Sequence, residues 1–90
     1  MELTPADVKT LKKWGYRKKD IEQIEVATSL TRYKYNDKLI CDGKARKLLG
    51  DEEYLSGISR SAFHYTATRY TPGGETIFFD SSALFNEGVF

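Results

Sequence analysis

The sequence is poor in the residues that form disulfides, metal centres and activated nucleophiles. Its 90 residues include one cysteine, one histidine, one tryptophan and two prolines. Cys41 has no second cysteine to pair with, which excludes a disulfide within the chain and favours the reducing interior of a cell. Cys41 and His64 lie too far apart in the sequence for zinc-ligand spacing, so we expect no metal ion.

The sequence also lacks the patterns of a phosphate-binding loop, a membrane span and a secretion signal. The segment GKARKLLG does not match G-x-x-x-x-G-K-[ST], so a P-loop is excluded and we expect no cofactor. No stretch approaches the roughly 18 apolar residues of a membrane helix. The N-terminal MELTPADVKT has no basic region followed by an apolar run. We therefore expect a cytoplasmic protein without a membrane partner.

What is present is the composition of one small globular domain, which we expect to span residues 1–90. Hydrophobic residues make up 40% of the chain, enough for a single core, and charged residues of both signs make up 30%. The net charge of +1 conceals an uneven distribution. Residues 1–49 carry twelve Lys and Arg against seven Asp and Glu, whereas residues 50–90 carry two against six. The two halves can therefore attract different partners.

The first 28 residues predict two helices joined by a tight elbow. Thr4 can cap the first helix, Pro5 suits its first position, and Asp7 suits the positive helix end. Gly15 ends this helix, and a second runs over residues 18–28. The apolar face of the first helix comprises Val8, Leu11 and Trp14. This half is predicted to be an αα-hairpin.

The remainder predicts short helices and antiparallel strands. Alternation over residues 31–42, with a turn at Asn36–Asp37, indicates a β-hairpin. Asp42 is expected to cap a helix that Gly50 ends, and Asp51 to begin another. Residues 62–70 fit both helical and strand periods, but their aromatic and β-branched content favours a helix to Ser59 or Arg60 and a strand from Ala62. With the TPGGE turn and the TIFFD strand, this predicts a C-terminal hairpin in a small sheet, hence an α+β fold.

The segment LSGISRSAFHYTATRY, residues 55–70, is the first candidate site because it gathers hydroxyl groups, arginines and the only histidine. This segment can bind a phosphate or carboxylate non-covalently, without catalysing a reaction. The candidate ligand- or partner-binding residues are Ser59, Arg60, Ser61, His64 and Arg69. A catalytic arrangement of Ser59, Ser61 or His64 with Asp80 lacks a G-x-S-x-G elbow, so we expect serines that cap a helix end and no enzyme activity.

The elbow LKKWGYRKK, residues 11–19, is the second candidate because basic and aromatic side chains alternate there. Lysines can contact phosphates while an aromatic ring stacks on a base. The candidate nucleic-acid-binding residues are Lys12, Lys13, Trp14, Tyr16, Arg17, Lys18 and Lys19. In the alternative interpretation, the two aromatic residues belong to the core and the lysines are merely solvated.

The segment KARKLLGDEEYLSGISRSAFHYTATRY, followed by IFFDSSALF and preceded by DVKTLKKWGYRKKDIEQIE, resembles short proteins of phages and mobile elements of Firmicutes bacteria. The resemblance implies a setting in a bacterial host cell, where such proteins act as inhibitors of host defence, anti-CRISPR proteins among them, or as transcriptional or DNA-binding accessories. We predict a small non-enzymatic binding protein that inhibits a bacterial immune component. It would either dock on a defence protein or nucleoprotein or sequester an anionic nucleotide.

The alternative is a nucleic-acid-binding accessory or regulatory protein that uses the basic elbow. The near-zero net charge argues against this role, because dedicated nucleic-acid domains are usually strongly basic. Homo-oligomerisation remains open.

Overall fold

The computed structural model describes residues 3–86, so the ends of the predicted domain lie outside the described residues. Within that range the chain forms helices first and then a sheet with helices interspersed, which confirms the α+β prediction. The elements are α1 (Pro5–Lys13), α2 (Lys18–Leu30), β1 (Arg32–Tyr35), β2 (Lys38–Ile40), α3 (Asp42–Leu49), α4 (Asp51–His64), β3 (Thr66–Tyr70), β4 (Thr76–Asp80) and α5 (Ser82–Asn86).

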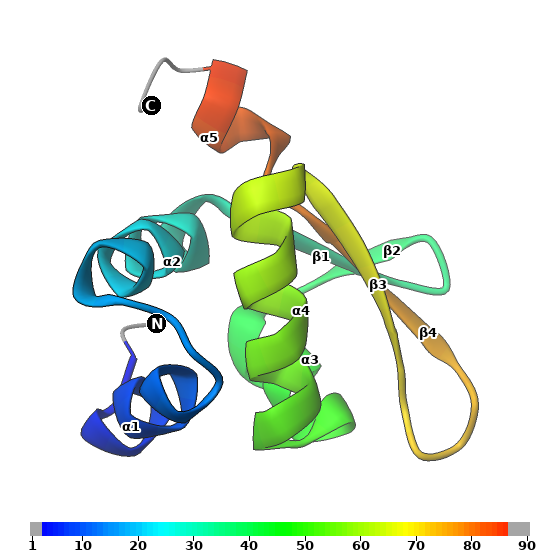
Figure 1. Cartoon of the computed structure of the whole chain (residues 1–90). Coiled ribbons are helices and arrows are strands. Elements are labelled where there is room, and N and C mark those ends of the chain that lie inside the picture. Colours follow the sequence, from blue (N-terminus) through cyan, green and yellow to red (C-terminus); the bar gives the residue numbers. More distant parts are fainter. Residues whose placement is uncertain (1–2, 87–90) are drawn as a thin grey trace.

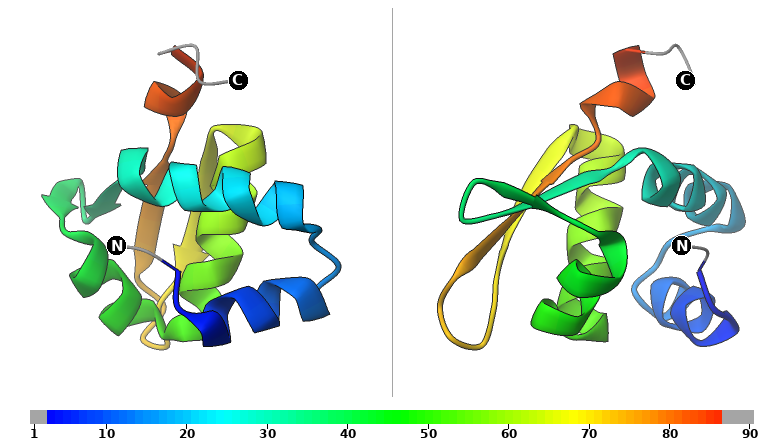
Figure 2. Two further views of the ribbon diagram at one scale, coloured as in Figure 1. Left: turned by 90° about the vertical axis from the view of Figure 1, so that its left-hand side faces the viewer. Right: turned by 180° about the vertical axis from the view of Figure 1, so that it is seen from behind.

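The four strands form one antiparallel sheet in the order β2-β1-β4-β3. Strand β4 therefore pairs with β1, from the first half of the chain, and with β3 beside it in sequence. Helix α4 lies along one face of this sheet, with α1 and α2 on the far side of α4 (Figure 1). Seen from behind, the other face of the sheet carries no helix (Figure 2). The described part of the chain is thus layered as helices on one face of a sheet.

The core lies between α4 and the sheet. Tyr33, Phe79 and Ala67 are paired across β1, β4 and β3 and are all buried, so they share the face toward α4. Ile58 and Ala62 of α4 are fully buried against this layer. Along the strands, the residues that alternate with Tyr33, Phe79 and Ala67 point to the opposite, open face of the sheet.

Local sequence signals fix most element ends. Thr4 and Asp7 form the capping box of α1: the Asp7 amide donates to the Thr4 hydroxyl at 3.2 Å, and the Thr4 amide donates to the Asp7 carboxylate at 3.1 Å. Asn36 and Asp37 both have positive φ, as a two-residue turn of the β1–β2 hairpin requires. Gly15, with φ of 99°, makes the elbow between α1 and α2. The predicted αα-hairpin and first β-hairpin are confirmed.

The prediction for residues 59–66 was wrong. Helix α4 continues to His64, and β3 begins only at Thr66. Ala62 follows Ile58 by one helical turn and fills the core, so burial outweighs the β propensity of the neighbouring residues. Tyr65, with φ of 69°, then reverses the chain from helix to strand.

Two smaller expectations were also wrong. Asp42 is the first residue of α3 rather than its cap, because its carboxylate accepts a hydrogen bond from the Tyr54 hydroxyl instead. Trp14 does not continue the apolar face of α1: it is 39% exposed and lies outside the core. Among residues 3–86, no helix combines the length and apolar character needed to cross a bilayer.

Candidate binding site between the elbow and helix α4

The two candidate segments of the sequence meet at one hollow in the surface. It has a volume of about 320 Å³, within the range of small-molecule sites. The elbow between α1 and α2 supplies one wall and α4 the other. The lining residues are Trp14, Tyr16, Ser56, Ser59, Arg60, Phe63 and His64. The chain therefore brings together residues that are more than forty positions apart in sequence.

Aromatic rings form the apolar part of the hollow. Tyr16 and Phe63 lie nearly parallel, with 6.3 Å between ring centroids and 8° between ring planes. Both are half-buried against the core, so they hold the elbow onto α4. The amide of Tyr16 donates to the carbonyl of Leu11 at 3.1 Å, which fixes the elbow backbone. Trp14 remains accessible at the rim.

Arg60 and His64 supply the positive and titratable groups of the hollow. They are one helical turn apart on α4, as are Ser56 and Arg60, so all three share one side of the helix. Arg60 and His64 are both exposed. Within residues 3–86, the Arg60 guanidinium has no hydrogen bond or ion pair. Its planar donor group is therefore available to a phosphate or carboxylate.

Neither predicted serine presents its hydroxyl to this hollow as a free group. Ser59 lines it but is 2% exposed, and its hydroxyl donates to the carbonyl of Ser56 at 3.1 Å. Ser61 is fully buried on another side of α4, so its assignment to a binding site was wrong. Its hydroxyl donates to the Ile58 carbonyl and accepts from the Ser81 hydroxyl at 3.0 Å, and Ser81 in turn contacts Thr31. Ser61 thus belongs to an internal hydroxyl chain that joins α4 to the connection between α2 and β1, at Thr31, and to the connection between β4 and α5, at Ser81.

Arg69 and Asp80 also lie outside the lining of the hollow. Arg69 projects from β3 toward α4, where one guanidinium nitrogen donates to the Ser56 carbonyl at 3.5 Å. The Asp80 carboxylate accepts from the Ser82 amide at 3.0 Å. Because Asp80 alternates with buried Phe79, it lies on the sheet face opposite α4. That placement separates Asp80 from Ser59 and His64, so these residues do not form a nucleophile, base and carboxylate array.

The basic residues of the elbow are all exposed. Trp14 and Tyr16 differ, because Trp14 is accessible whereas Tyr16 packs on the core, so neither interpretation of the elbow describes both residues. Of the basic elbow residues, Lys13 lines a neighbouring hollow, and the remainder line neither of the two hollows. Those remaining exposed basic residues are Lys12, Arg17, Lys18 and Lys19.

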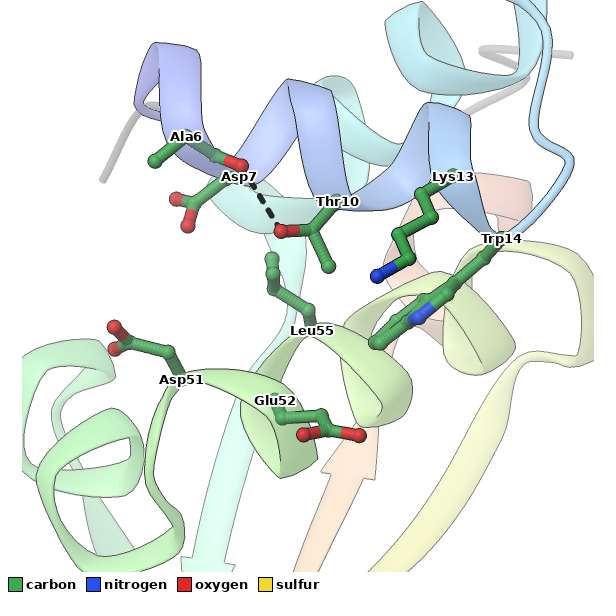
Figure 3. A pocket seen from close by; sticks show the side chains of 8 residues that line it. All are labelled: Ala6, Asp7, Thr10, Lys13, Trp14, Asp51, Glu52 and Leu55. Atoms are coloured by element: carbon green, nitrogen blue, oxygen red, sulfur yellow. Dashed lines mark hydrogen bonds between the residues drawn. The ribbon is translucent and has the colours of Figure 1, made fainter.

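Trp14 also lines this second hollow, which lies between α1 and the start of α4 and has a volume of about 300 Å³ (Figure 3). It contains the carboxylates of Asp7, Asp51 and Glu52 beside the amine of Lys13. Two of these carboxylates are already paired. Arg46 donates to Asp7 at 2.6 and 3.0 Å and to Asp51 at 2.8 Å. Burial raises the pKa of Asp7, but the hydrogen bonds from Arg46 and Thr4 outweigh it and hold the pKa below 3.8. This hollow is therefore mainly a structural ion-pair cluster.

A further polar cluster, which the sequence did not suggest, lies where α3 packs against α4 and β1. The Tyr54 hydroxyl donates to the Asp42 carboxylate and lies 3.3 Å from the Tyr33 hydroxyl. Burial is the main cause that raises the pKa of both tyrosines above the usual value of 10.0, and the Asp42 carboxylate adds to it. The Tyr54 hydroxyl raises the pKa of Tyr33 further, whereas the hydrogen bond with Tyr33 partly offsets the rise at Tyr54. Both stay protonated at neutral pH and offer no phenolate nucleophile. The arrangement stabilises the packing of α3 on α4 and β1.

Phe63 and Ser56 also line the hollow, although the sequence did not single them out as binding residues. The strand predicted from Ala62 includes Phe63. Its spacing of four residues from Ser59 and three from Arg60 is the helical signal that places all three on one side of α4. Within residues 3–86, no group of His, Cys, Asp and Glu side chains has the arrangement of a metal site. No protein-family model, curated protein or solved structure matches this chain.

Proposed function

We propose that this protein is a non-enzymatic binding protein that recognises an anionic group at the hollow between the elbow and α4. In the setting that the resemblance implies, it inhibits a bacterial immune component. It does so either by docking on a defence protein or nucleoprotein or by sequestering an anionic nucleotide. The observation that supports this most is the exposed guanidinium of Arg60, which has no partner among residues 3–86 and lies beside aromatic rings in one hollow of small-molecule size.

The chemistry of the hollow favours an anion attached to an apolar or aromatic body. Arg60 can donate two parallel hydrogen bonds to a phosphate or carboxylate. The stacked pair of Tyr16 and Phe63 and the accessible ring of Trp14 offer apolar contact beside it. The exposed basic residues of the elbow add a positive field that attracts an anionic partner.

Replacement of Arg60 by Ala tests this proposal. We expect binding to weaken by about 1.5–3 kcal/mol, the usual contribution of a charge-assisted hydrogen bond. The melting temperature should stay unchanged, because the side chain is exposed and makes no bond to residues 3–86. Affinity would be measured by calorimetry against a panel of nucleotides. Candidate protein partners would come from a bacterial lysate by pulldown and mass spectrometry, and each purified partner would then be titrated.

Lys47→Ala provides the matched control, since Lys47 is an exposed cation on α3, outside the hollow. It should retain both affinity and melting temperature. A destabilised Arg60→Ala protein with intact affinity would contradict the proposal, because Arg60 would then be a structural residue.

A second candidate function, nucleic-acid binding at the elbow, is supported by the exposure of Trp14 and of the surrounding lysines. Such binding would weaken with salt: the logarithm of the binding constant falls linearly with the logarithm of the salt concentration, with a slope of about 0.9 per phosphate contacted on duplex DNA. We expect weak binding of duplex DNA with little sequence preference. Gel shifts that show tight, sequence-dependent binding at physiological salt would favour the accessory role over inhibition.

A further inference from the structure

The open face of the sheet is a second surface, separate from the hollow on α4. Strand register places Leu39, Lys34, Phe78 and Thr68 in one row across β2, β1, β4 and β3. Their neighbours in the sheet core, Tyr33 and Phe79, face α4, so this row faces away from it. In Figure 1 and in the right-hand view of Figure 2, no helix of the described residues lies over this side of the sheet.

No helix or strand within residues 3–86 covers the apolar and aromatic side chains on this face. Leu39 is 68% exposed and Tyr70 63% exposed. Phe78 is only partly buried and does not belong to the hydrophobic core, although it lies on a central strand. The Phe78 ring lies between Lys34 on β1 and Thr68 on β3, so its partial burial contributes little to the stability of the fold.

The charge of the open face is net positive. Arg32 and Lys34 are exposed and lie two residues apart on β1, on the same side of the sheet. Asp80 is the acid among them, paired in register with Arg32 at one end of the face. Lys34 therefore remains as the cation beside the ring of Phe78, and Thr66 and Thr68 add hydroxyl groups along β3.

The area of the face limits what can occupy it. With strands about 4.8 Å apart and a rise of about 3.4 Å per residue, the face measures roughly 300 Å². A stable protein interface needs about 800 Å² from each partner, so neither a second copy of this chain nor a globular partner is well matched. An extended strand of about two or three nucleotides fits such a sheet, with bases stacked on its aromatic rings.

We infer that the open face binds a short segment of single-stranded nucleic acid. A base stacks on Phe78, with a second on Tyr70, while Lys34 and Arg32 contact the phosphates. The hydroxyls of Thr66 and Thr68, and the carboxylate of Asp80, lie where they can bond to base edges. This inference is independent of the proposed function, because none of its residues lines the hollow on α4.

Fluorescence anisotropy with labelled oligothymidylate and oligouridylate of about 10 nucleotides, at low salt, tests the inference. Phe78→Leu keeps an apolar side chain but removes the stacking ring and should weaken binding about tenfold or more. Lys34→Gln should lower the logarithmic salt slope by about 0.7, the contribution of one phosphate contact on a single strand. A thermal melt of each variant checks that the fold is retained, and Lys34→Gln, at an exposed position, keeps the test valid if Phe78→Leu is destabilised.

A control variant separates this surface from the rest of the protein. Lys47→Gln removes an exposed cation from α3, away from the open face, and should not change oligonucleotide affinity. The inference is overturned if the oligonucleotides do not bind at low salt, or if Lys34→Gln leaves affinity and salt slope unchanged. Equal displacement by polyglutamate, with the same sensitivity to both sheet variants, would also overturn it and assign the face to an acidic protein segment.

Discussion

Gly57 lies on the side of α4 that packs against the Phe79 ring of the sheet. A Cβ at this position would be only 2.5 Å from Cζ of Phe79, closer than real Cβ contacts allow. The absence of a side chain thus lets the helix rest directly on the central strand β4. The sequence offered no sign of this, because the ring that requires the space comes from a strand 22 positions later.

Gly57→Ala should therefore destabilise the protein by about 1–3 kcal/mol, since the added methyl group must displace the Phe79 ring or the helix. Gly43→Ala is the matched control, because a Cβ there meets nothing within 4 Å and Gly43 also lies in a helix. The control should leave stability unchanged or raise it by up to about 1 kcal/mol. Urea unfolding of both variants measures the difference. Equal stability of Gly57→Ala and the unaltered protein would mean that α4 can move off the sheet without cost.

At the scale of elements, the sequence predicted structure well where neighbouring residues alone determine it. The capping pair of Thr4 and Asp7, and the turn at Asn36–Asp37, each lie within a few residues of one another. The predicted boundary between α4 and β3 was wrong because its position depends on the packing of Ala62 against the sheet, which is distant in sequence. For the same reason, Arg60 and His64 could be selected from one segment, but their meeting with the elbow could not.

Helix α1 offers a direct test of local control. Thr4→Ala removes the hydroxyl that accepts from the Asp7 amide at 3.2 Å, and we expect a loss of about 1 kcal/mol in the free energy of unfolding. Thr4→Ser keeps the hydroxyl and should restore most of that stability. Thermal or urea unfolding of the two variants provides the measurement. Identical transitions for Thr4→Ala and the unaltered protein would show that the cap contributes nothing to α1.

At the scale of the whole molecule, Asp7 joins α1 to α3 through Arg46, which also holds Asp51 at the start of α4. Asp7 is 3% exposed, so removal of its charge leaves the partly buried Arg46 guanidinium with less compensating negative charge. Asp7→Asn should cost about 3 kcal/mol at neutral pH. No single segment of the sequence contains this ion pair, and it could be identified only from the fold.

The stabilisation from Asp7 should also depend on pH. Its folded-state pKa lies below 3.8, so the folded protein binds this proton less tightly than the unfolded chain does. The contribution is therefore complete above the unfolded pKa and is lost as the pH falls through the folded pKa. Between about pH 6 and about pH 3, the difference in unfolding free energy between the unaltered protein and Asp7→Asn should shrink. A difference that stays constant over this range would contradict the ion pair as its source.

The central position of β4 has a consequence for the order in which the protein can form. Strand β4 is the link between β1, made early in the chain, and β3, yet it comprises only residues 76–80. The hairpin of β1 and β2 and the unit of α4 and β3 therefore share no sheet hydrogen bonds until residues 76–80 have been synthesised. Pairing of Arg32 with Asp80 closes a loop of almost fifty residues, which makes it late and entropically costly. During translation, the sheet thus cannot be completed before β4 has been made, and cooperative folding waits for that strand.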